Sequence, residues 1–321
     1  MMAITKRKTY RPRRVRSDHP PAFQLTERDM QIVQLIARHR FLNSNHVRRL
    51  VGGSAKNVTN RLKALFEHGL LDRPQNQFDT YRMGGGTSPL VYALADKGAQ
   101  LLADMYEQPD GKRISWTHKN KSAGRPFLRH TLGIADFAVA MQISVAGRDE
   151  VNLIDGDELL DNFPAEILAR NKPYRLSVPV IHKNLRLDIG LEADYAFSLH
   201  LPKVRRKAFF LVEIDRGTMP VARRDLKQSS ILRKLLAYQT MWKMKLHQKH
   251  FGWGNFRVLF VTESSERVEN MITATNAQSL TRQSPLFLFA DKHSLYDQDD
   301  ALGAQWLNAH RKVEHLLPPM L

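Results

Sequence analysis

The sequence lacks cysteine altogether, and it also lacks any long uninterrupted apolar run. The first absence excludes disulfides, thiol catalysis and cysteine-based zinc sites, and it suits a reducing cytosol. The second argues against a membrane-spanning helix, which needs about 18 consecutive apolar residues. The N-terminus has no apolar segment of the kind found in secretory signals. We therefore predict a cytoplasmic protein with no membrane partner.

Acidic residues are few relative to basic ones. The 321 residues include 49 Lys and Arg but only 32 Asp and Glu, so the formal net charge is +17. An excess of this size is typical of proteins with a polyanionic partner. Hydrophobic residues make up 42% of the chain, which provides a substantial core, and the length favours two domains. The partner that we expect is double-stranded DNA.

Composition divides the chain into four segments. They are a basic arm (1–22), a first domain (23–106), a linker (107–126) and a second domain (127–321). The arm has too few apolar residues to pack, so we expect disorder in the free protein. Its Arg11, Arg13 and Arg14 suit phosphates or a minor groove. The alternative is a tail that only adds solubility.

The first domain has the pattern of a winged helix-turn-helix. Thr26 and Asp29 form a capping-box-like start, and apolar residues then recur at helical spacing. Ser44 and Ser54 are the N-caps that we predict for two further helices. A glycine run and a returning strand complete a two-stranded wing. The predicted elements are helices at 26–40, 44–50, 55–68 and 96–106, with the returning strand at 90–94.

The third helix of this motif would enter the major groove. We expect its exposed face to read bases and contact phosphates, because Asn pairs with adenine and Lys reaches guanine or phosphate. The residues predicted there are Lys56, Asn57, Thr59, Asn60 and Lys63. Arg61 is predicted to contact phosphate, and Arg73 and Arg82 to lie on the wing. The alternative is a winged helix that serves protein contacts.

The second domain alternates helices and strands, which predicts an α/β fold. An acidic, irregular stretch at 147–175 separates its first helix from its first strand. Apolar runs and helical spacing give the remaining elements. The predicted helices lie at 127–146, 221–249, from Ser264 or Ser265 onward, and at 302–316. The predicted strands lie at 178–181, 185–191, 191–199, 208–215, 256–261 and 286–289.

Two carboxylates stand at the end of one predicted buried strand. Glu213 and Asp215 follow the apolar run 209–212, and alternation places both on one face. Asp194 is predicted to lie on a neighbouring strand. Buried carboxylates need a cation, a partner or a metal. We predict that the three acids bind Mg²⁺ or Mn²⁺, and the alternative is pairing with nearby basic residues such as Arg223 and Arg224.

The order of these elements resembles the core of the PD-(D/E)XK nuclease superfamily. The resemblance implies that Asp194 is the first acid and Glu213 the second, with Mg²⁺ activating the attacking water. Asp215 occupies the position that lysine normally holds. Lys227 or Lys234, on the following helix, would then supply the missing cation. Other members of the superfamily are inactive folds that bind DNA or a partner, which is the alternative here.

Several stretches carry a further resemblance through their order along the chain. They are LTERDMQIVQLIARHRFLNSNHVRRL from Leu25, RLKALFEHGLLDR from Arg61, Tyr92–Leu94 with Lys97–Ala99, Leu128–Leu132 through Phe137, Glu192–Asp194, and FLVEIDRGT from Phe210. In this order they resemble the replication-relaxation family of plasmids and other mobile elements. The resemblance implies a bacterial DNA-binding protein linked to plasmid replication or DNA relaxation.

Three functional hypotheses follow. The first is a DNA-binding accessory or initiation protein, in which the arm and the long helix at 221–249 also hold the backbone. The second is a Mg²⁺-dependent endonuclease or nickase that uses Asp194, Glu213 and Asp215. The third is a non-enzymatic regulator or assembly factor that forms homo-oligomers or binds a mobile-element protein. A tyrosine relaxase is disfavoured, because Tyr195 and Tyr238 have no accompanying cluster of three histidines.

Overall fold

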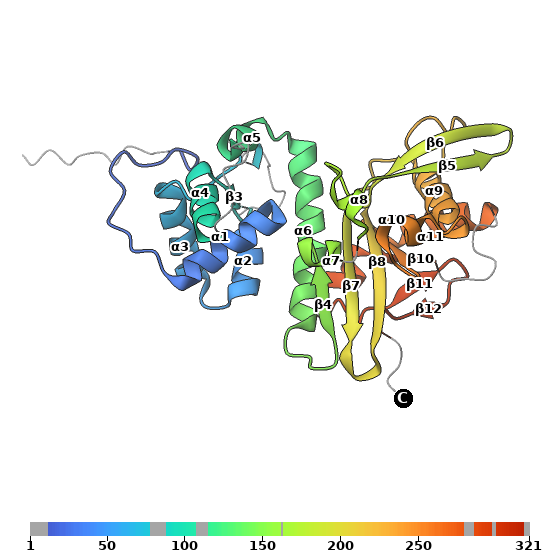
Figure 1. Cartoon of the computed structure of the whole chain (residues 1–321). Helices are drawn as coiled ribbons and strands as arrows, with labels where there is room; N and C mark the ends of the chain where they lie inside the picture. The colour runs from blue at the N-terminus through green and yellow to red at the C-terminus, as the bar shows by residue number, and fades with distance from the viewer. Residues whose placement is uncertain are drawn as a thin grey trace, which may run out of the picture. The chain divides into compact units, whose positions relative to one another are not determined.

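The computed structural model of the chain is drawn in Figure 1. It describes residues 12–77, 88–106, 115–161, 163–278, 286–296 and 300–317. The fold is α/β, as predicted, and the chain divides into two compact units, Met1–Ala135 and Asp136–Leu321. No helix in the described ranges has the length and apolar character that crossing a membrane requires.

The first unit combines helices with a small antiparallel sheet. The sheet has the order β1-β3-β2, in which Phe41 pairs with Ala93 and Leu71 pairs with Leu94. The elements are α1 (Glu27–His39), β1 (Phe41–Asn43), α2 (Ser44–Val51), α3 (Ala55–Glu67), β2 (Leu71–Asp72), β3 (Val91–Leu94), α4 (Asp96–Met105) and α5 (Trp116–Ser122). The helix α5 lies inside the segment that we predicted to be a linker. The predicted glycine turn at 84–86 falls outside the described residues.

Helix caps in this unit follow the sequence closely. Thr26 and Asp29 form the predicted capping box at α1, and Ser54 accepts from the amide of Asn57 at α3. The N-cap of α2 is Asn43 rather than the predicted Ser44, because the Asn43 side chain accepts from the amides at positions 45 and 46. Gly69 follows α3 with φ of +80°, a conformation that glycine adopts without strain.

The part of the arm that the structure describes makes polar contacts with the first unit that the expectation of disorder did not include. The Arg16 guanidinium donates to the carbonyls of Phe66 (2.7 Å) and Leu71 (2.9 Å), and it pairs with the carboxylate of Asp72. The amide of Ser17 donates to Oε2 of Glu67 at 2.6 Å. The segment from residue 12 onward is therefore attached to the end of α3 and to β2 by polar contacts that a count of apolar residues overlooks.

The second unit is built on a seven-stranded mixed sheet with the order β12-β11-β10-β9-β8-β7-β4. Strands β8, β9 and β10 are parallel, and the remaining neighbours are antiparallel. The strands are β4 (Asn152–Asp155), β7 (Tyr195–Leu201), β8 (Arg206–Ile214), β9 (Arg257–Thr262), β10 (Phe287–Asp291), β11 (Trp306–Asn308) and β12 (Val313–Glu314).

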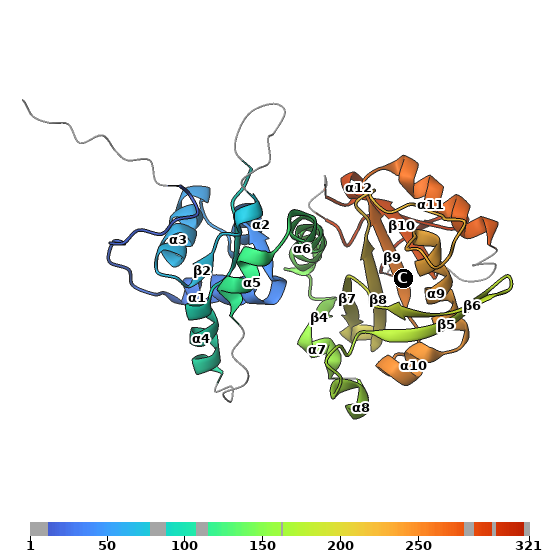
Figure 2. The same ribbon diagram turned by 90° about the horizontal axis from the view of Figure 1, so that it is seen from above.

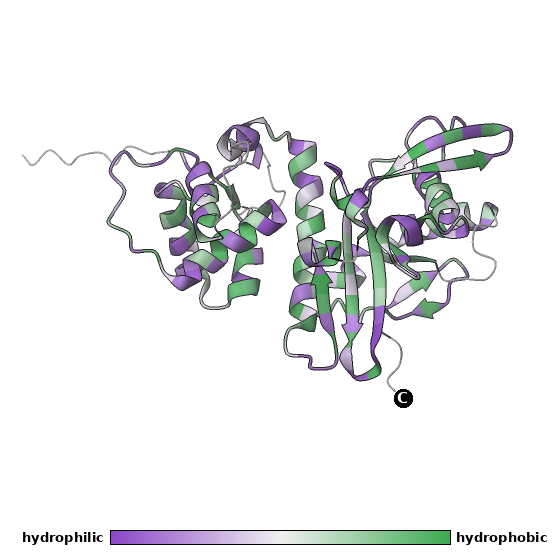
Figure 3. Cartoon of the chain, viewed as in Figure 1, coloured by the Kyte–Doolittle hydropathy of each residue, from purple (hydrophilic) through white to green (hydrophobic). Residues whose placement is uncertain are grey.

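Helices cover both faces of this sheet (Figure 2). One face packs against the C-terminal part of α6 (Arg125–Val145) and α12 (Lys292–Tyr296), with Phe210 and Val212 pointing toward them. The other packs against α9 (Ile231–Lys243), α10 (Leu246–Phe251) and α11 (Ser265–Ala277), with Leu211 in the same core. Figure 3 shows the apolar strands between these helices. The alternation predicted for the strand at 208–215 is therefore confirmed.

A hairpin stands apart from the main sheet. Strands β5 (Leu176–His182) and β6 (Leu185–Leu191) pair only with each other in the described structure, and β5 packs against α9. Figure 1 shows the hairpin extending away from the central strands. The stretch 147–175, predicted to be irregular, includes β4 and two short helices, α7 (Asp157–Leu160) and α8 (Ala165–Leu168).

The long helix predicted at 221–249 is wrong in its first third. Residues 216–230 form a loop, and α9 begins only after Ser230, whose hydroxyl caps the amide of Arg233. Lys245 then adopts φ of +53° and separates α9 from α10. The helix predicted at 302–316 is also wrong. Trp306 is fully buried there because β11 pairs with β10, and Arg311 at φ of +59° makes the turn into β12.

Candidate functional site

The candidate site lies where strand β8 ends. Glu213 is the penultimate residue of β8 and Asp215 follows the strand directly. Their side chains are buried, with 2% and 7% of each residue exposed. Both contact helices that pack on the face of Leu211, so the predicted common face is confirmed. The two carboxylates nevertheless have separate partners.

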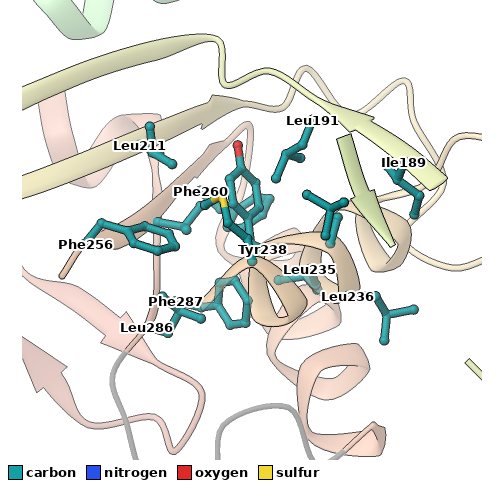
Figure 4. Close-up of a cluster of buried hydrophobic side chains, with 14 of the residues drawn as sticks. Ile189, Leu191, Leu211, Leu235, Leu236, Tyr238, Phe256, Phe260, Leu286 and Phe287 are labelled. Atoms are coloured by element: carbon teal, nitrogen blue, oxygen red, sulfur yellow. The ribbon is translucent and has the colours of Figure 1, made fainter. Parts of the chain in front are cut away.

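Glu213 contacts two side chains of helix α9. Nζ of Lys234 donates to Oε2 and forms a salt bridge, while the hydroxyl of Tyr238 donates to Oε1 at 2.6 Å. Lys234 and Tyr238 are one helical turn apart, so a single face of α9 presents both donors. Figure 4 shows Tyr238 among buried residues that include Leu191, Leu211 and Phe260. Apolar walls thus surround the carboxylate.

Burial dominates the acid–base behaviour of this group. It raises the pKa of Glu213 to about 7; Lys234 opposes the shift and the charge of Asp194 adds to it. Burial lowers the pKa of Lys234, but the charges of Glu213 and Asp194 outweigh it, so the net direction is upward. Burial also raises the pKa of Tyr238 well above its usual range. The phenol therefore remains a donor, and Glu213 titrates near neutral pH.

Asp194 stands beside Glu213 on the neighbouring chain segment. It immediately precedes β7, not within a strand as predicted, and Tyr195 pairs with Val212. Its Oδ2 accepts from the amide of Ile214 at 2.8 Å, and its own amide donates to the carbonyl of Val212 at 3.0 Å. The sequence therefore identified two acids, Asp194 and Glu213, that the fold brings to adjoining strand ends.

Asp215 belongs to a different network. It accepts two hydrogen bonds from the guanidinium of Arg267 in α11 and one from the Thr262 hydroxyl at 2.8 Å. The amide of Gly217 donates to it at 3.2 Å. Sequence reasoning missed Arg267, although its place in the first turn after the Ser264 cap, directly behind β9, was the available signal. Asp215 is thus held as a structural ion pair.

The donor set for a divalent cation is smaller than we predicted. Within the described ranges, no group of three or more His, Asp and Glu side chains is placed to hold a metal. Arg267 neutralises Asp215, and Lys234 neutralises Glu213. Asp194 and Glu213 are the acids near each other that a cation would use, and Mg²⁺ is often held by one or two carboxylates with several waters. Three carboxylates do not converge.

The two candidate lysines differ in position. Lys234 reaches Glu213, whereas Lys227 is exposed in the loop before α9. Its amide donates to Asp225, and its carbonyl accepts from Arg233. The basic residues that pair with the two acids are Lys234 and Arg267 rather than Arg223 and Arg224. Arg223 instead donates to the Ser229 carbonyl and the Gln228 side chain, and both arginines are exposed.

The first unit presents the predicted polar face of α3. The five side chains expected to read DNA are all exposed to solvent: Lys56, Asn57, Thr59, Asn60 and Lys63. Val58, Leu62 and Leu65 on the other side of the helix are buried. Arg28 donates to the carbonyls of Val51 and Gly52, which fixes the turn between α2 and α3. The exposed face is therefore carried on a well-packed helix.

Two other residues predicted to contact DNA, Arg61 and Arg73, make contacts within the first unit. Arg61 pairs with the buried carboxylate of Asp29 and donates to the carbonyl of Gln24. Arg73 lies 4.1 Å from the ring centre of Phe66 and donates to the carbonyl of Arg13 at 2.6 Å. These contacts hold α3 and the arm in place. Arg13 and Arg14 are exposed, and Arg11 and Arg82 lie outside the described residues.

A model of a protein family described as Replication-relaxation matches residues 33–256, well over half of the chain. The chain belongs to the replication-relaxation family. Comparison with curated proteins and with solved structures found no significant match. In this replication-relaxation protein the matched range includes α3, Asp194, Glu213, Lys234 and Tyr238. It ends before Arg267.

Proposed function

We propose that this replication-relaxation protein binds double-stranded DNA of a plasmid or other mobile element through helix α3. It acts there in replication or DNA relaxation. The observation that carries the proposal is the face of α3, where two asparagines and two lysines are exposed on a helix whose other side is buried. Asn suits adenine, and Lys suits guanine or phosphate.

The arrangement of the first unit supports this use of α3. Its order of helix, strand, two helices and a strand pair is compatible with a winged helix-turn-helix, a motif in which the third helix enters the major groove. The net charge of +17 favours a polyanion. Arg28 and Arg61 brace the two ends of the motif, so α3 is presented with little loss of freedom on binding.

Selection of bound duplexes from a random pool, followed by titration at several salt concentrations, tests the proposal. Asn57→Ala with Asn60→Ala should reduce discrimination between selected and random duplexes by about tenfold or more. Lys63→Ala should weaken binding to all sequences and reduce the salt slope by about 0.9. Lys121→Ala, an exposed lysine of α5, is the control. Equal binding of selected and random DNA, unchanged by the α3 variants, would contradict the proposal.

A second candidate function is metal-dependent DNA cleavage in the second unit. The observation that favours it is that Lys234 reaches Glu213 from α9, beside Asp194. Two acids with a lysine supplied by the following helix are the donor set of a PD-(D/E)XK site with a relocated lysine. Asp194 and Glu213 would hold Mg²⁺ or Mn²⁺, which would stabilise the charged phosphate and lower the pKa of a bound water. Asp215, which pairs with Arg267, would not bind the metal in this candidate site.

The chain's own groups would then have separate tasks. Tyr238 orients Glu213 through Oε1, and Lys234 holds a positive charge where a phosphate oxygen would gain negative charge. Incubation with supercoiled plasmid and Mg²⁺ or Mn²⁺ tests the candidate. Glu213→Gln and Lys234→Met should each abolish nicking, whereas Glu269→Gln, an exposed acid in α11, should not. Nicking by Glu213→Gln at the wild-type rate would reject the site.

A further inference from the structure

The loop before α9 concentrates positive charge on the second unit. Residues 216–233 contain five cationic side chains and one carboxylate, Asp225. The cations are Arg216, Arg223, Arg224, Lys227 and Arg233. Arg223, Arg224 and Lys227 are exposed, and none of them forms an ion pair in the described structure. Three exposed cations within five residues, against the single carboxylate of Asp225, raise the local potential and favour a polyanion.

The loop is held in a defined conformation. The amide of Ile231 donates to the carbonyl of Pro220 at 3.1 Å, and that of Leu232 donates to the carbonyl of Val221 at 2.8 Å. Arg267 donates to the carbonyl of Met219. Leu226 is buried in the core of the unit. The side chains of Arg224 and Lys227 are thus carried on a backbone that is attached at both ends and in the middle.

This loop borders the Glu213 pair. A cavity of about 120 Å³ is lined by loop residues Met219 and Ser229, by Arg233 and Lys234 of α9, and by residues 189–192 around the end of the hairpin, which include the carboxylate of Glu192. Lys234 is the residue that pairs with Glu213. Nε of Arg233 is buried here and makes no hydrogen bond within the described part of the chain. The guanidinium of Arg233 thus borders the cavity and also donates to the Lys227 carbonyl of the loop.

We propose that the loop 216–230, with Arg233, is a second nucleic-acid contact surface that binds the phosphodiester backbone. It extends the proposed DNA binding from α3 to the second unit. A nucleic acid fits better than an acidic protein, because stable protein interfaces use apolar or aromatic anchors at their centre. None of the exposed large apolar side chains of the described residues lies between positions 216 and 233. Cations and polar groups alone are enough for phosphates.

Paired substitutions in the full-length protein test the surface. Arg224→Ala with Lys227→Ala removes two exposed cations from the loop, and Lys243→Ala with Lys249→Ala removes two exposed cations from α9 and α10. Affinity for a fluorescent duplex is measured by anisotropy over a range of salt concentrations. The loop pair should reduce the slope of log affinity against log salt by about 1.8, and the control pair should leave it unchanged.

The outcomes separate this surface from the proposed role of α3. Equal salt slopes for the loop and control pairs would contradict the proposed loop surface, but they would not affect the proposal that α3 binds DNA. A reduced salt slope in the loop pair, together with α3 variants that bind DNA like wild type, would support the loop surface and reject the role of α3. Binding of polyglutamate as tightly as of DNA at equal charge would also overturn the proposal, in favour of an acidic protein partner.

Discussion

Lys234 of helix α9 donates a hydrogen bond to Oε2 of Glu213 in strand β8, and the two residues are 21 positions apart. The contact joins the end of a central strand to the helix that covers it. Because Glu213 is almost fully buried, its charge depends on this one cation and on the Tyr238 hydroxyl. The pair therefore links the stability of the unit to the chemistry proposed for it.

Replacing Lys234 with methionine should destabilise the protein most at alkaline pH. At pH 8 the buried Glu213 carboxylate would lose its cation, and the free energy of unfolding should fall by about 3 kcal/mol. At pH 5 the loss should be smaller, because Glu213 can take up a proton. Urea unfolding at both pH values measures the difference. Lys243→Met, on the exposed side of α9, should change the free energy of unfolding by less than about 0.5 kcal/mol; an equal loss in both variants would contradict the prediction.

Glu213 should also make the wild-type protein less stable as pH rises from about 4.5 to 7. Its pKa is about 7 in the folded protein and about 4.5 in the unfolded chain. Across this window the folded form binds the proton more tightly, so raising the pH favours unfolding. The advantage of wild type over Glu213→Gln should therefore shrink by about 3 kcal/mol between these limits.

Chemical denaturation at half-unit pH steps measures this difference. Tryptophan fluorescence reports it, because Trp253 and Trp306 are buried in the second unit. Glu269→Gln serves as the control, since Glu269 is exposed and pairs with Arg311 at the surface. A difference between wild type and Glu213→Gln that stays constant across the window, or grows with pH, would show that the carboxyl is ionised throughout.

The sequence predicted the strand that bears Glu213 well, for a physical reason. An apolar run of four residues that ends in acids and glycine has few alternatives to a buried strand, and alternation then fixes the faces. The caps at Thr26 and Ser54 could also be predicted from the sequence, because a cap depends on residues within one turn of the helix. Elements that depend on contacts between residues close in the sequence could therefore be predicted from the sequence alone.

The side chains that pair with Glu213 and Asp215 were harder to predict from the sequence, because these contacts depend on tertiary packing. Arg267 lies 52 positions from Asp215, and only the parallel pairing of β8 with β9 brings α11 near it. The helix predicted at 302–316 failed for a similar reason. Its apolar residues fit a helical period, but Trp306 is fully buried in a strand, β11, that pairs with the distant strand β10. The contacts that Arg61 makes with Asp29 and Arg73 with Phe66 also depend on tertiary packing, so the sequence did not predict them.

Arg267→Met should destabilise the protein by about 3 to 5 kcal/mol, since it leaves the buried Asp215 carboxylate without its cation. Arg311→Met removes a comparable side chain from an exposed pair with Glu269, and its cost should stay below about 1 kcal/mol. Urea unfolding at pH 7 measures both. Equal costs would mean that Asp215 is neutral or solvated in the folded protein, and would reopen its assignment as a ligand.

Arg16 should control how the basic arm leaves the first unit. Its guanidinium holds two carbonyls and Asp72 and lies 5.0 Å from the ring centre of Phe66, while Ser17 next to it is bound by Glu67. Arg16→Ala removes these donors, so amide hydrogen exchange across residues 12–23 should become at least tenfold faster. Arg14→Ala, an exposed neighbour, should leave exchange unchanged. If both variants exchange like wild type, Arg16 is not the anchor. If only Arg16→Ala exchanges faster and also binds DNA with a smaller salt slope, the anchor positions the arm's cations on the backbone.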